Sequence, residues 1–224
     1  MAFSGAFGKA FRPAFDAGLA AAGPWYLAGG APTPIAVYQP KGAADLAASY
    51  VNLVTPGTYN AAPGTAPTLD ASGWVFDGSS QYLATGVVPS SNDWSMAVRF
   101  SGATVFGSHA LCGIYTGGAQ DFSLWQVTGG SKAMYINRVM LNSAYATTAG
   151  ILAMAGKSAY YNGAPDGTIG AGTVSGSLTI AIGAVRQGVS SVAYYFLGSI
   201  QAVAIWDTST GHATWMPAVN AAVA

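Results

Sequence analysis

The side chains that could carry hydrolytic chemistry are few in this chain. All eight acidic residues are Asp, Glu is absent, and there are only two His. Glycoside hydrolysis needs two carboxyl groups about 5 to 10 Å apart across the sugar, but no two Asp lie two residues apart. A Ser-His-Asp hydrolase often carries its Ser in a Gly-x-Ser-x-Gly turn. That pattern is absent, and neither His109 nor His212 has a recognisable partner, so the residues predict a protein that is not an enzyme.

Residues that could hold a metal ion are equally sparse. Cys112 is the only Cys, which excludes an intrachain disulfide and a Cys-rich zinc site; we expect it to be a small buried side chain. The Asp residues are scattered singly. Asp77, Asp121 and Asp166 each fit a turn or a strand end, where a carboxylate accepts backbone hydrogen bonds. We therefore predict no metal site.

A glycan-binding site needs neither catalytic residues nor a metal ion. It needs an aromatic platform and a few amide or carboxylate groups on a sheet face. If Phe122 and Leu124 face the core, alternation turns the neighbouring side chains outward, and the same holds for the strand that contains Met134 and Ile136. The candidate glycan-binding residues are Trp125, Tyr135, Asn137 and Asp121. Alternatively, the two aromatic side chains belong to a subunit interface or are covered by the N-terminal segment, since exposed aromatic residues mark interfaces of every kind.

Strands and tight turns are the elements that must position these residues. Trp74 to Leu83 has the pattern of a β-hairpin whose polar turn contains Asp77-Gly78. Trp94 to Phe100 alternates apolar and polar residues, which predicts a half-buried strand. Further strands are expected at residues 111–115, 121–127, 133–140, 150–155, 158–161, 178–183 and 196–206. Short turns between them predict an all-β, antiparallel two-sheet sandwich, with a short closing helix at residues 212–223.

The balance of charge limits the partners. Eight basic and eight acidic residues give a formal net charge of zero, so no positive field attracts nucleic acid. A neutral surface favours association, and we expect a homo-oligomer or incorporation into a larger assembly. The longest apolar stretches, at residues 20–30 and 196–206, are too short or too interrupted to cross a bilayer. We therefore expect no membrane span.

Residues 1–30 differ from the remainder of the chain, which we expect to form one domain over residues 31–224. Four aromatic residues recur there at a spacing of four: Phe3, Phe7, Phe11 and Phe15. Gly5, Gly8 and Pro13 oppose a helix, so we predict an extended attachment arm followed by a small-residue linker. Burying each ring is worth about 1.5 to 3 kcal/mol. The arm should therefore dock, either on its own domain as an edge strand or on a neighbouring subunit.

Five blocks in order resemble the laminin G-like, concanavalin A-like jelly-roll family. They are Trp74 to Leu83, Trp94 to Phe100, Ser158 to Gly163, Ile182-Gly183 and Phe196 to Asp207, and the resemblance covers residues 35 to 220. It implies an antiparallel jelly-roll sandwich used for surface recognition. Some relatives bind calcium through carboxylates and loop carbonyls. Here no acidic cluster supports such a site, so no cofactor is predicted. Calcium is the only ion that the resemblance itself would allow.

Two functional hypotheses follow. The N-terminus does not resemble a secretory signal, because Lys9 and Arg12 are followed by Pro13 and Asp16 instead of an apolar segment. With the arm and the jelly roll, this favours a non-enzymatic structural protein of a bacteriophage virion or a cell surface, located on the virion or outside the cell. Its partners would be other virion or surface subunits. The alternative is a lectin-like adhesin module that binds a surface polysaccharide.

Overall fold

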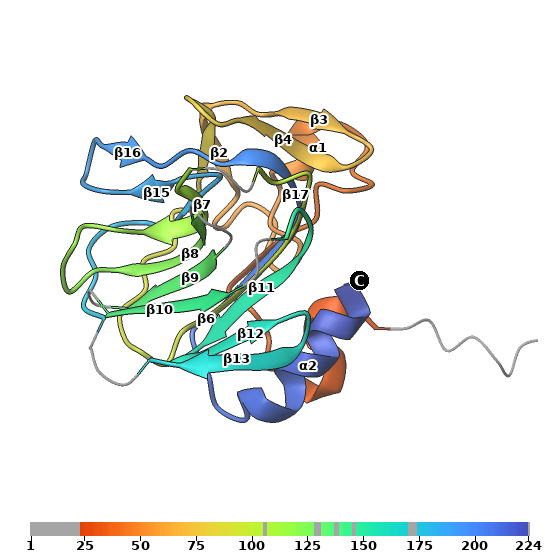
Figure 1. The fold of residues 1–224 in the computed structure, drawn as a ribbon. Helices are drawn as coiled ribbons and strands as arrows, with labels where there is room; N and C mark the ends of the chain where they lie inside the picture. The colour runs from red at the N-terminus through yellow and green to blue at the C-terminus, as the bar shows by residue number, and fades with distance from the viewer. Residues whose placement is uncertain are drawn as a thin grey trace, which may run out of the picture.

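Two antiparallel β-sheets pack face to face, and two helical segments cover the outer side of one of them (Figure 1). This is a computed structural model, and it describes residues 23–104, 107–127, 131–136, 139–144, 147–169 and 174–223. The predicted all-β, two-sheet jelly-roll sandwich is confirmed. The four Phe of the expected arm lie outside the described residues.

The first sheet is organised around its longest strand, β17. The strand order is β13-β12-β11-β6-β17-β4-β3, and β1 also pairs with β17. Its strands are β1 (Ala36–Tyr38), β3 (Thr68–Asp70), β4 (Gly73–Asp77), β6 (Ser95–Ser101), β11 (Gly150–Ala155), β12 (Ser158–Tyr161), β13 (Ala164–Thr168) and β17 (Leu197–Trp206). One edge of β17 pairs with β6, and the other pairs first with β4 and then with β1.

The second sheet has the order β10-β9-β8-β7-β14-β5-β2. Its strands are β2 (Ala62–Thr65), β5 (Tyr82–Ala84), β7 (His109–Ile114), β8 (Phe122–Val127), β9 (Ser131–Ile136), β10 (Val139–Ala144) and β14 (Ala181–Ile182). A small hairpin of β15 (Val185–Arg186) and β16 (Val192–Ala193) joins this sheet where Arg186 pairs with Ile114 of β7. The hairpin projects at the side of the molecule farthest from the helices (Figure 1).

Alternation along β6 correctly predicts which side chains enter the core. Met96, Val98 and Phe100 all belong to the main hydrophobic cluster between the sheets. The expectation of a half-buried strand is wrong, however, because Ala97 on the opposite face is only 2% exposed. That face is covered by the 3-10 helix η1 (Trp25–Gly30) and the C-terminal helix α2 (His212–Val223).

Helix α2 confirms the predicted closing helix. Its Trp215 ring packs on Trp206 of β17, with ring centroids 5.1 Å apart, and Trp206 Nε1 donates a hydrogen bond to the Pro32 carbonyl at 2.9 Å. Residues 25–30 of the expected linker form η1, which packs against α2. The short helix α1 (Leu46–Ser49) is capped by Asp45, whose carboxylate accepts from Ala48 N.

Trp74 to Leu83 is not a hairpin. Strand β4 pairs with β17 and β3 in the first sheet, whereas β5 pairs with β14 and β2 in the second. The turn therefore carries the chain from one sheet to the other. Asp77 organises this turn, since its carboxylate accepts hydrogen bonds from the backbone N–H groups of Ser79 and Ser80 and from both hydroxyls.

Candidate functional site

Asp121 is a loop-forming residue. Its side chain is fully buried, and its carboxylate accepts hydrogen bonds from Thr116 N at 2.7 Å, Thr116 Oγ1 at 3.2 Å and Gly118 N at 3.3 Å. The alternative expectation of a structural role at a strand end is confirmed. The expectation that it shares an open sheet face with Trp125 is wrong, because these hydrogen bonds hold the carboxylate inside the loop that joins β7 to β8.

Trp125 lies on the expected face of the second sheet, away from the core that holds Phe122 and Leu124. It is nevertheless only 3% exposed, and its Nε1 donates to Ser123 Oγ at 2.6 Å. Two tyrosine rings cover it: Tyr115 at 5.1 Å and Tyr194 at 4.9 Å between centroids. The prediction that Trp125 itself is an exposed platform is therefore wrong.

Of the other two candidate residues, the structure describes only Tyr135. Tyr135 lies in β9, where its backbone pairs with Ser123 of β8 and Met140 of β10. Asn137 lies outside the described residues. The glycan-binding role of these two residues stays a prediction.

Tyr194 is the exposed ring of this region. It is 40% exposed, and its φ of 57° lies in the left-handed region, which is uncommon for a residue other than Gly. Tyr194 and Tyr115 also contact each other edge to face, with centroids 6.0 Å apart. The exposed ring thus packs on two other aromatic rings.

Backbone hydrogen bonds fix the segment after β16 to β7 and to the turn that follows β14. Ala110 N donates to the Tyr194 carbonyl at 2.8 Å, and Phe196 N donates to the Gly183 carbonyl at 2.8 Å. His109 Nδ1 lies 2.6 Å from the Tyr195 carbonyl oxygen. Because a carbonyl only accepts, Nδ1 is the protonated nitrogen in this contact. These contacts direct two consecutive tyrosines onto neighbouring parts of one surface.

Tyr195 belongs to a second group of side chains beside the first. Its ring lies 6.5 Å from that of Tyr82, and the Arg186 guanidinium lies 5.7 Å from the centroid of Tyr82. Arg186 also donates from one Nη to the Val189 carbonyl at 3.3 Å, while its buried Nε has no hydrogen-bond partner among the described residues. We use the name aromatic ledge for the following residues: Tyr82, Tyr115, Trp125, Arg186, Tyr194 and Tyr195.

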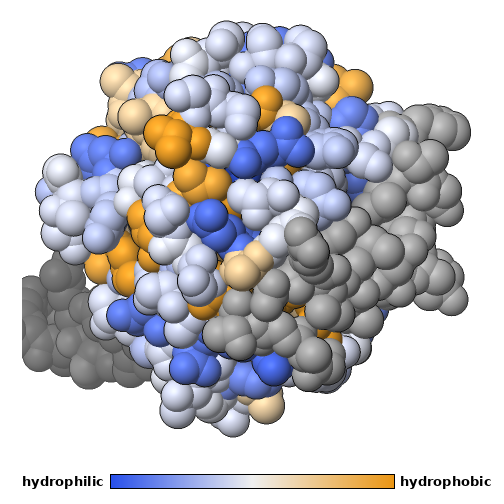
Figure 2. Space-filling model, turned by 90° about the vertical axis from the view of Figure 1, so that its left-hand side faces the viewer, coloured by the Kyte–Doolittle hydropathy of each residue, from blue (hydrophilic) through white to orange (hydrophobic). Residues whose placement is uncertain are grey.

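Figure 2 looks onto the side of the molecule that carries β15 and β16. Apolar residues form small separate groups there, surrounded by polar ones. The aromatic ledge combines rings that can stack on a ligand with tyrosine hydroxyls and a guanidinium that can form hydrogen bonds. Among the described residues, no group of three His, Cys or Asp could hold a metal ion.

One feature of the sequence points to the aromatic ledge. Tyr194 and Tyr195 are adjacent aromatic residues just before the strand Phe196 to Asp207. Neither residue is near Trp125 in sequence, so local alternation could not reveal that Tyr194 covers it.

Comparison with known proteins supports the fold. No family model and no curated protein matches the chain. A Trypanosoma rangeli sialidase in complex with 2,3-difluorosialic acid aligns with a TM-score of 0.58 and 12% identity, over 84% of this chain and 33% of that chain. At this identity the similarity concerns the fold alone, and it agrees with the two-sheet sandwich.

Two smaller proteins give lower scores. The CBM40 module of a Ruminococcus gnavus IT-sialidase, bound to alpha2,3 sialyllactose, aligns with a TM-score of 0.42 and 18% identity, over 57% of this chain and 83% of that chain. A heptameric SAP-like pentraxin from Limulus polyphemus aligns with a TM-score of 0.44 and 14% identity, over 60% and 72% of the two chains. In the part of the chain that the structure describes, no helix is both long and apolar enough to cross a membrane.

Proposed function

We propose that this protein is a carbohydrate-binding module that holds its glycan on the aromatic ledge. The observation that carries the proposal is Tyr194, an exposed ring held in a left-handed backbone conformation over Trp125 and Tyr115. Such a conformation costs about 1 to 3 kcal/mol, and residues that adopt it cluster at functional sites. Tyr59 is similarly exposed and also has a left-handed φ, so the feature that singles out Tyr194 is its packing on Trp125 and Tyr115.

The chemistry of the ledge suits a sugar better than a purely apolar ligand. The C–H face of a pyranose can stack on the Tyr194 ring, while the Arg186 guanidinium and the tyrosine hydroxyls form hydrogen bonds with sugar hydroxyls. Within each of the two groups the rings contact one another, so little side-chain conformational entropy is lost when a ligand binds. Double-sheet jelly rolls serve as lectin domains as well as capsid proteins, which makes the fold compatible with this role.

The test is binding of the full chain to a glycan array, followed by calorimetric titration with the best ligand. Tyr194→Asn removes the ring and places a residue that tolerates the left-handed region. We expect at least about a tenfold loss of affinity, as when an aromatic anchor residue of an interface is removed. The matched control is Tyr59→Asn, because Tyr59 is 43% exposed and has a φ of 55°, and it should bind as the wild type does. A folded wild-type protein with a blank array would refute the proposal.

The structural role on a virion or cell surface stays a prediction. It rested on the fold resemblance, the N-terminal sequence and the arm, and the four Phe of that arm lie outside the described part of the chain. Self-association and a location outside the cell also stay predictions. No observation on the described residues favours the structural role over glycan binding.

A further inference from the structure

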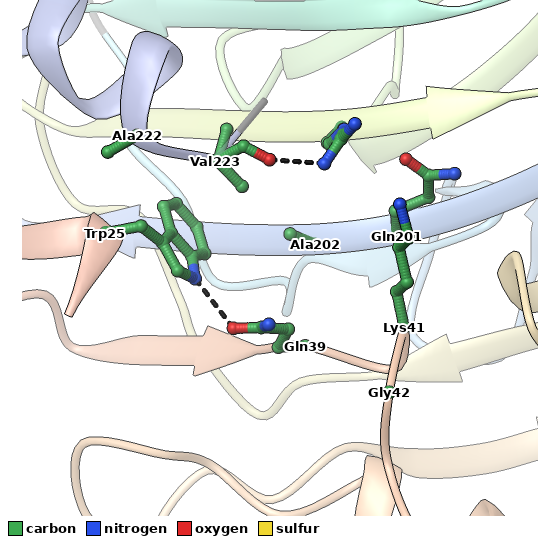
Figure 3. Close-up of a pocket in the computed structure, with 9 residues that line it drawn as sticks. Trp25, Gln39, Lys41, Gly42, Gln201, Ala202, Ala222 and Val223 are labelled. Atoms are coloured by element: carbon green, nitrogen blue, oxygen red, sulfur yellow. Dashed lines mark hydrogen bonds between the residues drawn. The ribbon is translucent and has the colours of Figure 1, made fainter. Parts of the chain in front are cut away.

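A second candidate site lies on the other sheet, away from the aromatic ledge. It is a pocket of about 360 Å³ between η1, the turn after β1, the strands β6 and β17, and the end of α2 (Figure 3). The side chains that give it chemical character are Trp25, Gln39, Lys41, Arg99 and Gln201. Its volume is at the lower end of the range for small-molecule sites.

The charge of the pocket is unusual for this chain. Two of the eight basic residues, Lys41 and Arg99, line it, and no acidic residue does. Within the described part of the chain, the Lys41 ammonium has no hydrogen-bond or ion-pair partner. Arg99 donates from one Nη to the Val223 carbonyl, and its other N–H groups remain for a ligand. An anion is therefore favoured in this pocket.

The amide side chains add directed hydrogen bonds. Gln39 Oε1 accepts from Trp25 Nε1 at 2.9 Å (Figure 3), so its NH₂ group is left as a donor. Gln201 Nε2 donates to Ser101 Oγ at 3.0 Å, which leaves its Oε1 as an acceptor. The two amides thus present opposite hydrogen-bonding groups to the pocket, as a ligand with several hydroxyls requires.

Trp25 supplies an aromatic wall, and the floor is apolar. Figure 3 places Trp25 and Lys41 on opposite sides of the pocket. Ala202 and Val223 form a small hydrophobic cluster with Ile151, and Trp25 packs against it. The pocket therefore suits a ligand of three properties. An apolar face would pack on the flat ring, hydroxyls would bond to the two amides, and a negative charge would lie near the two cations.

We propose that this pocket binds a sugar unit that bears a carboxylate. The carboxylate lies between Lys41 and Arg99, the ring packs against Trp25, and hydroxyls reach Gln39 and Gln201. This site does not depend on the aromatic ledge, because the ledge lies on the outer face of the other sheet.

The experiment is calorimetric titration of the full chain at low salt with sodium glucuronate and sodium galacturonate. Glucose, galactose and sodium acetate serve as comparison ligands. We expect at least one uronate to bind at least about tenfold more tightly than its neutral sugar, and to weaken as salt is added. Acetate binding as tightly as the uronates would overturn the assignment of a sugar, and equal binding of neutral and acidic sugars would overturn the role of the cations.

Variants connect this binding to the pocket. Lys41→Gln changes an exposed side chain and should weaken uronate binding at least about tenfold. Arg99→Gln should do the same, although it also removes the contact with Val223. The matched control is Lys157→Gln, since Lys157 is not among the residues that line the pocket. Uronate binding that survives in Lys41→Gln would refute the proposal. Tyr194→Asn should leave uronate binding unchanged, so that this proposal and the ledge can fail separately.

Discussion

At the scale of single residues, the scattered Asp side chains hold turns. Asp77 is the clearest case, because its two carboxylate oxygens receive hydrogen bonds from two consecutive serines. Desolvation is the largest single influence and acts to raise the pKa of Asp77. The hydrogen bonds from Ser80 and Ser79 together outweigh it and hold the pKa well below its usual range.

This shift predicts a dependence of stability on pH. Since the pKa of Asp77 is lower in the folded state, its contribution to stability is complete above the unfolded value near 3.8 and decreases as the pH falls below that value. Asp77→Ala should lower the midpoint of urea unfolding at pH 6, and the difference from the wild type should shrink near pH 3. An equal difference at both pH values would contradict the role of the ionised carboxylate.

Trp125 shows how far residue-level reasoning could reach. Alternation correctly placed Phe122 and Leu124 in the core and Trp125 on the other face. It could not show that Tyr194 covers Trp125, because that contact joins segments 69 residues apart along the chain. The face of β8 on which Trp125 lies follows from the local sequence, whereas the exposure of its side chain depends on a segment far away in the sequence.

At the scale of elements, the connection from β4 to β5 shows the same limit. The pattern of two strands and a polar turn was right, but a local sequence does not state whether two strands pair with each other or belong to opposite sheets. Here the turn crosses between the sheets, and Phe76 packs edge to face on Phe196 with centroids 6.4 Å apart. The order of the five blocks nevertheless predicted the fold class correctly.

Gly183 connects β14 to β15 against the ring of Phe76. Its φ is 76°, and a Cβ there would lie 2.2 Å from Phe76 Cε1. Gly183→Ala therefore adds a clash to backbone strain. Gly30 is a matched control, because its φ is also 76° and a Cβ would meet nothing within 4 Å.

We expect Gly30→Ala to cost about 1 to 2 kcal/mol from backbone strain alone. Gly183→Ala should cost about 1 to 3 kcal/mol more, because Phe76 must move in a packed core. Urea unfolding of both variants measures the difference. Equal losses of stability would show that Phe76 adapts without cost.

At the scale of the whole molecule, the only thiol of the chain is buried in the core between the two sheets. Cys112 is fully buried, and its Sγ lies 3.1 Å from Met96 Sδ. Burial raises the pKa of the Cys112 thiol well above its ordinary value. The thiol should be unreactive unless the sandwich opens.

Labelling of Cys112 should therefore report opening of the whole sandwich. In the folded protein we expect reaction with an aromatic disulfide reagent to be slow and to follow the unfolding equilibrium as urea is added. The comparison is the same reaction in fully denaturing urea, where labelling should be immediate. Rapid labelling without urea would mean that the sheets separate locally around β7.

The position of β17 in the first sheet affects how the chain can fold during its synthesis. The first sheet is completed only when residues 197–206 are inserted between β6 on one edge and β4 and β1 on the other. Strand β17 follows β1, β4 and β6 in the sequence, so it is the last of these four strands to be translated. Until then the segments on its two sides have no common partner in that sheet, and their apolar faces stay uncovered. Contacts over such long stretches of sequence slow folding, so the nascent chain must remain unaggregated until β17 has been translated.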